Sequence, residues 1–296
     1  MNPSTIKLLG TLEILNPGNT FFWETVTQGE FNLWNLMINE GFVNPTDIEI
    51  VFEHWQNIET WGTPTNPNDY RYAPPRSERD DDDWNEEVEN QRQEYYQQLQ
   101  QLLKTSCHNI QAYNLRVTKS KENGYERRNP DFSVSIIVAQ TSSNHWFCLA
   151  PTVPNQVNYS RNRKTTLQNQ AAQAPSAEIQ TILSNLTPIE IYGYYDAGYD
   201  ETYQHYIVSI MGKSKNEIIA SALQSSNMVT IESVDVEYSS NYLNGRKISQ
   251  FMNQCLKSRT KYEISFWDIG YTYEVGQTPA GDWIGTNSRY EFEYNP

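Results

Sequence analysis

The sequence predicts a mixed α+β protein made of two tandem domains, and three observations lead to this prediction. Ten residues starting at Val138 recur without a gap from Val275, with Val, Gln, Thr and Trp in the same four positions. The 296 residues exceed a single domain of the usual size, roughly 100–200 residues. Segments of helical and of strand periodicity alternate along the chain. With 38% hydrophobic and 13% aromatic residues, each half can build a core.

The repeat places a first domain at 1–154 and a second at 176–296. Residues 155–175 between them are polar, locally basic and almost free of large aliphatic side chains, so we interpret them as the linker. A second segment of loop composition runs from Gly62 to Arg79 and is rich in Pro, Asn and Tyr. We expect it to be a long loop inside the first domain.

The second domain is predicted to begin with a helix capped by Ser176 and ended by Pro188, with Ile179, Ile182 and Leu186 on one face. The following elements are expected in chain order: a buried strand from Tyr203 to Met211, a short helix through Ile218, Ile219 and Leu223, a strand from Met228 to Tyr238, a helix from Gly245 to Leu256, and a hairpin from Tyr262 to Val275.

The first domain shows the same pattern, with an N-terminal helix through Leu8, Leu9, Leu12 and Leu15 and a long helix from Trp84 to Leu103. Both long helices end in Leu-Lys followed by Thr or Ser, 153 residues apart, whereas the repeat downstream is 137 residues apart. We therefore expect the first domain's hairpin to be longer by 16 residues, at Lys119 to Asp131.

The turn of the second copy, Thr278-Pro-Ala-Gly281, is replaced in the first copy by Ser142-Ser-Asn144. Gly supplies a positive φ at a turn corner, and Asn is its usual substitute in the left-handed region. The two turns are predicted to share one geometry.

The net charge of −14 and the pI near 4.7 argue against direct binding to nucleic acid, because that affinity comes mainly from Lys and Arg on phosphates. An acidic surface suits a basic protein partner, although it also simply favours solubility. The three cysteines have no metal-ligand spacing, and a reducing, cytoplasmic setting fits them best. No apolar run predicts a signal peptide or a membrane span. We expect no cofactor and no metal.

The segment Gly276-Gln-Thr-Pro-Ala-Gly-Asp-Trp-Ile-Gly285 resembles the closing hairpin of the nuclease A inhibitor family. Val229 to Val236 resembles the family's central acidic strand, and the helix ending at Leu256-Lys257-Ser258 resembles its long helix. The first domain is similar to a diverged copy, through Thr46 to Phe52 and Val138 to Leu149. The resemblance implies a three-layer α/β/α sandwich of the pathogenesis-related-1 type in each domain.

The resemblance also implies a function, which is inhibition of a sugar-nonspecific, metal-dependent nuclease through an acidic surface. The family's acidic position falls near Asp200 or Glu201. The family's C-terminal Thr, directed at the metal of the nuclease, has no counterpart in Tyr294-Asn-Pro296. An acidic binding role is therefore expected, with direct engagement of the metal in doubt.

Two candidate partner-binding segments follow. Asp80, Asp81, Asp82 and Asp83 could occupy a basic cleft, or could be a solvated helix start in which Asp83 caps and Glu86 completes a capping box. The second segment, which includes Tyr195, Tyr199, Asp200 and Glu201, is predicted to be a Tyr-rich loop resembling a paratope.

No catalytic constellation stands out, because the four histidines are scattered and lack nucleophiles or acids at catalytic spacing. The leading hypothesis is a non-enzymatic acidic protein that regulates a basic nuclease by occluding its active-site cleft. The alternative is a two-domain structural adaptor, or a subunit of an immunity or defence complex, that bridges protein partners.

Overall fold

The computed structural model describes residues 2–62, 76–78, 84–116, 133–154, 176–196, 199–234, 243–266 and 269–291. It confirms the mixed α+β prediction. The chain forms two compact units. Unit 1 is discontinuous in sequence, because residues of unit 2 lie between its two segments. Unit 1 combines residues 1–36 with 229–293, and unit 2 is built from residues 37–228.

Unit 1 contains α1 (Pro3–Leu15), β1 (Thr20–Trp23), α2 (Thr25–Gln28), the start of α3 (Leu33–Asn39), β9 (Val229–Ser233), α9 (Leu243–Cys255), β10 (Lys257–Phe266), β11 (Ile269–Gln277) and β12 (Trp283–Glu291). Its sheet has the order β1-β12-β11-β10-β9, and every neighbouring pair is antiparallel.

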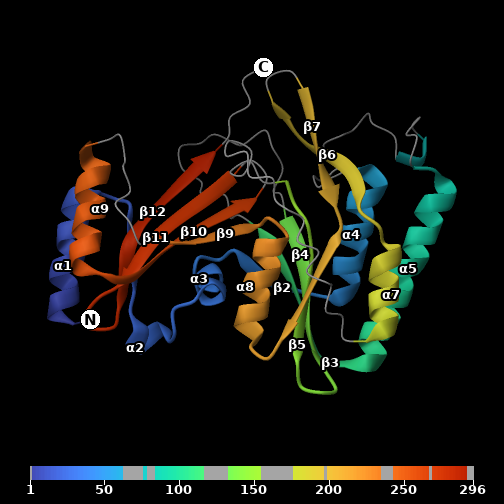
Figure 1. The fold of residues 1–296 in the computed structure, drawn as a ribbon, viewed down its shortest axis with the longest axis horizontal. Helices are drawn as coiled ribbons and strands as arrows, with labels where there is room; N and C mark the ends of the chain where they lie inside the picture. The colour runs from blue at the N-terminus through green and yellow to red at the C-terminus, as the bar shows by residue number, and fades with distance from the viewer. Residues whose placement is uncertain are drawn as a thin grey trace. The chain divides into compact units, whose positions relative to one another are not determined.

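Side chains cover both faces of the unit 1 sheet. Helices α1 and α9 lie against one face, where Leu12, Met252 and Ile284 form a buried cluster (Figure 1). On the other face the Phe31 ring stacks on Trp283, with centroids 4.7 Å apart, and meets Tyr262 edge-on. Strand alternation accounts for this division, because neighbouring residues of one strand point to opposite faces.

Unit 2 contains the end of α3, β2 (Val43–Thr46), α4 (Ile48–Trp61), η2 (Arg76–Glu78), α5 (Glu86–Ser106), β3 (Cys107–Arg116), β4 (Ser133–Thr141), β5 (Trp146–Pro151), α7 (Ala177–Asn185), β6 (Ile189–Asp196), β7 (Tyr199–His205), β8 (Ile207–Gly212) and α8 (Lys215–Ser225). Its main sheet has the order β2-β3-β4-β5-β8, and β6 pairs with β7 in a separate hairpin.

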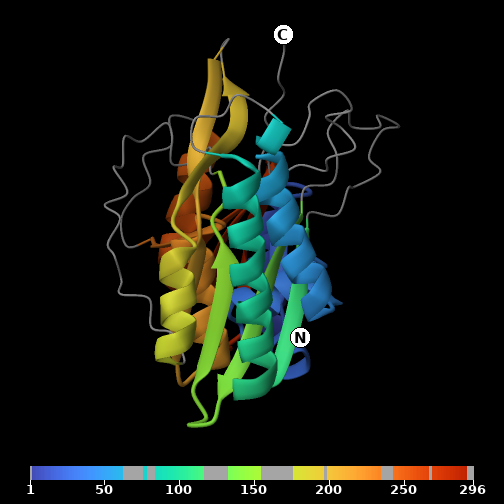
Figure 2. The same ribbon diagram turned by 90° about the vertical axis from the view of Figure 1, so that its right-hand side faces the viewer.

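In unit 2, α4, α5 and α7 pack on one face of the main sheet while α8 packs on the other, over β5 and β8 (Figures 1 and 2). The large core lies on the three-helix side, where Trp55 of α4, Leu99 of α5 and Ile182 of α7 meet Phe147 and Leu149 of β5. The unit is therefore a sheet between two helical layers.

The two halves of the chain share one order of elements, α-β-α-β-α-β-β-β. In the first half these are α1, β1, α3, β2, α5, β3, β4 and β5, and in the second they are α7, β8, α8, β9, α9, β10, β11 and β12. The first half adds α2, α4 and η2, and the second adds the β6–β7 hairpin. The sequence repeat thus corresponds to a repeat of structure.

The predicted division at residues 155–175 does not match the structure. The last strand of each half pairs with the first strand of the repeated pattern in the other half, β12 with β1 and β5 with β8. Each unit therefore takes its first α-β-α elements from one half and its β-α-β-β-β elements from the other. The residues of the predicted linker from 155 to 175 lie outside the described parts of the chain.

The prediction of a shared turn geometry is confirmed. Gln140 lies opposite Trp146, and Gln277 lies opposite Trp283, so both hairpins have one register. The Asn144 amide donates to the Thr141 carbonyl oxygen at 2.9 Å, and the Gly281 amide donates to that of Thr278 at 3.0 Å. Both corner residues have a positive φ, 61° at Asn144 and 93° at Gly281.

The predicted length difference between the hairpins needs a correction. The β-bulges of β3 and β10 each contain a residue with positive φ, Asn109 at 49° and Ser258 at 51°, and these are 149 residues apart rather than 153. Compared with the offset of 137 at the turn, the first hairpin is longer by 12 residues. The Leu-Lys pairs are not structurally equivalent, because α5 ends at Ser106, three residues after Leu103, whereas α9 ends at Cys255, one residue before Leu256. The segment Lys119 to Asp131 lies outside the described residues.

Three further element predictions change. The long helix α5 is capped by Asn85, whose side chain accepts from the Val88 amide, and it begins at Glu86 rather than at Trp84. The expected strand from Tyr203 to Met211 is two strands that separate at Tyr206, since β7 pairs with β6 and β8 with β5. The described part of the strand predicted at Met228 to Tyr238 is β9, which ends at Ser233.

Candidate functional site: a hairpin with a buried polar base

The four predicted contact residues of the second half all lie on the β6–β7 hairpin. In its main-chain register Tyr195 pairs with Asp200, Tyr194 with Glu201, and Asp196 with Tyr199. The predicted Tyr-rich loop is thus largely a pair of strands, because Tyr and Ile are favoured in strands. Residues Asp80, Asp81, Asp82 and Asp83 fall outside the described residues, so the structure does not place the other candidate segment.

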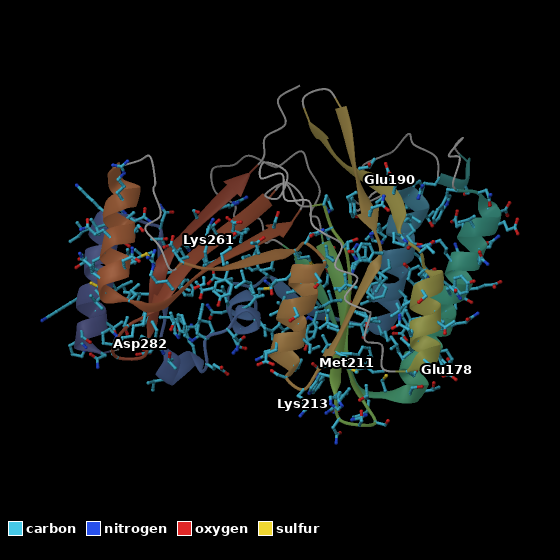
Figure 3. The ribbon with its side chains drawn as sticks, viewed as in Figure 1. Glu178, Glu190, Met211, Lys213, Lys261 and Asp282 are labelled. Atoms are coloured by element: carbon cyan, nitrogen blue, oxygen red, sulfur yellow. The ribbon has the colours of Figure 1, made fainter. Side chains whose placement is uncertain are left out.

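The hairpin is an insertion in the second half of the chain. In the first half only residues 16–19 connect α1 to β1, whereas residues 186–206 connect α7 to β8 and contain both hairpin strands. The hairpin extends past the ends of α4, α5 and α7 (Figures 1 and 2). Glu190 lies near its base, and accepts hydrogen bonds from Thr202 at 2.6 Å and Gln204 at 3.4 Å across the ladder (Figure 3).

An apolar cluster attaches the hairpin to the helical layer. Ile189 and Ile191 of β6 are buried against Ile58 of α4 and against Trp84, which precedes α5. Val88 and Tyr203 pack around this cluster. Both α4 and the hairpin are additions to the repeated pattern, so the two insertions bury each other's apolar surface.

Directly beside this cluster lies a buried polar network centred on Glu59, in the last turn of α4. Arg92 of α5 donates two hydrogen bonds to its carboxylate, Nε to Oε2 at 2.7 Å and an Nη to Oε1 at 2.8 Å. Tyr96 donates a third, at 2.6 Å. The side chains of Arg92 and Glu59 are only 7% and 3% exposed. A bidentate ion pair with a third donor offsets the cost of burying both charges.

Arg92 also reaches the hairpin. Its other terminal nitrogen donates to the Thr187 carbonyl oxygen at 3.0 Å, and Thr187 precedes the first residue of β6 by two positions. The network therefore joins α4, α5 and the start of the hairpin through one guanidinium group. Burial, followed by the neighbouring Glu59 carboxylate, raises the pKa of Tyr96 well above its usual range, so its hydroxyl stays a donor.

His205, the last residue of β7, is fully buried beside this network. Its Nδ1 lies 3.4 Å from the Tyr203 hydroxyl, and its Nε2 has no hydrogen-bond partner among the described residues. Burial lowers the pKa of His205 to about 4. The imidazole is therefore neutral at physiological pH.

A second histidine of unit 2, His54 of α4, places Nδ1 2.9 Å from the Ser135 hydroxyl. Burial lowers the pKa of His54 as well. The parts of the chain that the structure describes hold no group of three His, Cys, Asp or Glu side chains arranged for a metal ion. The arrangement at Glu59 is closed and internally bonded, and what it does physically is fix the position of the hairpin.

Sequence reasoning missed this network, although the chain contained a sign of it. The apolar face of α4 has Val51, Trp55 and Ile58 at helical spacing, and Glu59 continues it four residues after Trp55. Arg92 similarly precedes Tyr96 by four residues on α5. Charged residues of opposite sign on the inner faces of two helices indicate a buried pair, but only the tertiary structure shows that these helices face each other.

Among the described helices none is long and apolar enough to cross a membrane. No protein-family model, no curated protein and no solved structure matches this chain.

Proposed function

We propose that this protein is a non-catalytic acidic binding protein that uses the β6–β7 hairpin to contact a basic protein partner. One observation carries the proposal: a hairpin rich in Tyr and acidic residues is inserted in one half only, extends past the helices and is fastened at its base. Insertions on a repeated scaffold are where binding residues concentrate, because the scaffold positions them without depending on them for its core.

The composition of the hairpin suits a protein interface. Its strands read Ile-Glu-Ile-Tyr-Gly-Tyr-Tyr-Asp and Tyr-Asp-Glu-Thr-Tyr-Gln-His. Tyr offers a large contact area with few rotatable bonds and is enriched in interfaces. Asp200 and Glu201 add charge of the same sign as the whole chain, at −14, which speeds encounter with a basic surface.

The fastening at the base supports the same proposal. A binding loop that must become ordered on association loses conformational entropy, roughly 0.5–1.5 kcal/mol per immobilised side chain. The Arg92 bond to Thr187 and the cluster of Ile189 and Ile191 hold the hairpin before any partner arrives. Pre-organisation of this kind improves affinity without adding contacts.

A nuclease with a basic active-site cleft is the partner class to test first. This choice comes from the resemblance of Gly276 to Gly285 to the nuclease A inhibitor family, and inhibition would follow from occlusion of the cleft. The pathogenesis-related-1 type of sandwich is likewise our proposal for the fold. It is supported by side chains covering both faces of each sheet.

A charge-reversal experiment tests the proposal. A variant with Asp200→Lys and Glu201→Lys is compared with a control that carries Glu30→Lys and Glu53→Lys. These two acids are exposed, lie outside the hairpin strands and give the same change in net charge. Each tagged protein is used for affinity capture from its native cells at about 50 and about 300 mM salt, and captured proteins are titrated and assayed for nuclease activity.

The hairpin variant is expected to weaken binding of the captured basic protein at least about tenfold, and the control pair by less than about threefold. Nuclease activity in the captured fraction should be inhibited by the unsubstituted protein and released by the hairpin variant. Equal effects of the two variants would show that net charge alone matters, and would rule the hairpin out as the contact. The same comparison with Asp80 to Asp83 reversed tests the other candidate segment.

The adaptor alternative is favoured by one observation, which is that the two units are elaborated differently. Unit 2 has α4 and the hairpin, whereas unit 1 has neither. An adaptor would bind a different partner with each unit. In the capture experiment it would lose one partner on reversal of Asp200 and Glu201 and retain the other, whereas an inhibitor would lose its single target.

A further inference from the structure

Unit 1 is completed by an arm from the far end of the chain. The arm, residues 2–36, contributes α1, β1, α2 and the start of α3, and it lies against residues 229–291, which we call the second body. The equivalent arm of the second half, residues 176–228, completes the sheet of the first body, residues 43–151, through β8. The exchange is therefore reciprocal, as in a two-fold dimer in which each subunit gives its first α-β-α elements to the other.

A buried polar contact selects which body the first arm joins. Thr5, in the first turn of α1, is fully buried and donates from Oγ1 to Asp282 at 2.8 Å (Figure 3 labels Asp282). The residue at the same place in α7 is Ile179, counted from the caps Asn2 and Ser176. If α7 packed on the second body in place of α1, Ile179 would take the place of Thr5. The carboxylate of Asp282, a residue that is 5% exposed, would then lack that donor. A buried unpaired carboxylate is costly.

A second contact selects in the same direction. Phe31 of the first arm packs between Trp283 and Tyr262 of the second body. In unit 2 the corresponding rings, Trp146 and Tyr113, instead face the ammonium group of Lys215, 5.7 and 5.5 Å from their centroids.

Lys215 also donates to Gln111 and to the Tyr113 hydroxyl. The second body has Thr260 where the first has Gln111, since both directly follow the bulge in their strands. On the second body the Lys215 ammonium would therefore lose the amide oxygen of Gln111, and the shorter Thr260 side chain offers only a hydroxyl. These contacts favour the observed pairing of each arm with its body.

We propose that residues 2–36 form a transferable docking arm whose partner is the second body of another copy of this chain. The β1–β12 ladder, the hydrogen bonds of Thr5 and Thr25 and the stacking of Phe31 on Trp283 all join the arm to residues 229–291, and an identical surface exists on each further copy. Two chains that exchange these arms form a closed two-fold dimer with the same contacts in each unit 1 as the monomer.

Disulfide trapping tests which body receives the arm. Thr20 and Thr286 lie directly opposite each other in β1 and β12, and both are partly exposed. In a chain whose native cysteines are replaced by Ser, Thr20→Cys with Thr286→Cys should close a disulfide within one chain at low protein concentration. The matched control is Thr20→Cys with Leu149→Cys, which occupies the same strand position in the first body. It should form none, and a disulfide there would overturn the proposal.

Mixing tests the exchange between copies. Chains with Thr20→Cys alone and chains with Thr286→Cys alone are unfolded together in urea, refolded at several protein concentrations and then oxidised. Because a tethered arm has an effective concentration on the order of 1 mM, roughly one tenth of the chains should be dimeric at about 0.1 mM. The cross-linked product should contain one chain of each kind, and its yield should rise with concentration.

A measurement without substitutions keeps the proposal falsifiable if a variant folds poorly. Isotope-labelled and unlabelled chains of the native sequence are refolded together and weighed by native mass spectrometry. Mixed dimers that persist on dilution are expected, because release of the arm requires unit 1 to open. Monomers alone at every concentration, in both experiments, would refute the proposal.

Discussion

Replacing Glu59 by Gln perturbs the buried network with the smallest change of shape, and we expect a large loss of stability. The amide keeps one acceptor oxygen for Tyr96 or Arg92 but removes the negative charge. The guanidinium group of Arg92, whose side chain is 7% exposed, would remain buried without a counter-charge. Removal of one partner from a buried pair costs about 3–5 kcal/mol. The retained acceptor places the expected loss near the lower end, at about 3 kcal/mol.

The same two helices provide the control. Glu49 of α4 and Lys104 of α5 form an ion pair with side chains 59% and 41% exposed. Glu49→Gln removes one charge from the same helix pair, but water screens the site, so less than about 0.5 kcal/mol should be lost. The comparison separates burial of the pair from its mere presence between α4 and α5.

Urea unfolding, followed by tryptophan fluorescence and by circular dichroism, measures the effect. With a slope of about 2 kcal/mol per molar urea, Glu59→Gln should lower the unfolding midpoint by about 1.5 M. The double variant Glu59→Met with Arg92→Met should recover part of the loss, since no charge is left buried. Recovery should be incomplete because the Thr187 carbonyl oxygen loses its donor. If Glu59→Gln fell within about 0.5 kcal/mol of the Glu49→Gln control, the argument for a stabilising buried network would be refuted.

Three further predictions follow from the structure. Burial lowers the pKa of His205 to about 4, whereas the ordinary value in an unfolded chain is near 6.5. As the pH falls from 6.5 to 4, the unfolded chain binds a proton that the folded chain does not, so up to about 3 kcal/mol of stability should be lost. His205→Phe should flatten that part of the curve of stability against pH, and an unchanged curve would contradict the assignment. Gly285→Ala should destabilise the folded protein by more than about 2 kcal/mol in thermal unfolding, because the added Cβ would lie 2.0 Å from the Glu274 carbonyl oxygen. In the same assay Gly10→Ala in α1 should stabilise the protein by about 0.5–1 kcal/mol, because its Cβ would meet nothing within 4 Å. Cleavage at a protease site inserted in residues 155–175 should leave the two fragments together in size-exclusion chromatography, because each unit contains elements of both halves; fragments that separate without denaturant would show that the halves close on themselves.

Several features of the fold were within reach of the sequence because they depend on local chemistry. Ser176 caps α7 through a hydrogen bond from the Ile179 amide, as the polar residue before an apolar periodic stretch predicts. Asn144 takes the place of Gly281 in the left-handed region, so the turn geometry followed from residue type alone. Both features are fixed by residues within a few positions of each other.

The candidate site was only partly predictable. The Tyr-rich acidic segment was recognised by composition, but its strands required the register between Tyr195 and Asp200, which pairs β6 with β7. The buried bond between Glu59 and Arg92 joins residues 33 positions apart, and the sequence does not show that the two helices that carry them face each other.

The sequence by itself determined that this chain contains one pattern of elements twice, since apolar spacing, caps and turns are written in each copy. Only the tertiary structure decided how the copies combine. Both arms have the same α-β-α order, and strand propensity does not distinguish β5 from β12 as a neighbour for β1. That choice depends on contacts between residues more than 200 positions apart, Thr5 with Asp282 and Phe31 with Trp283. A buried hydroxyl-to-carboxylate bond and a stacked ring pair select one body over the other, and they exist only once the chain has folded.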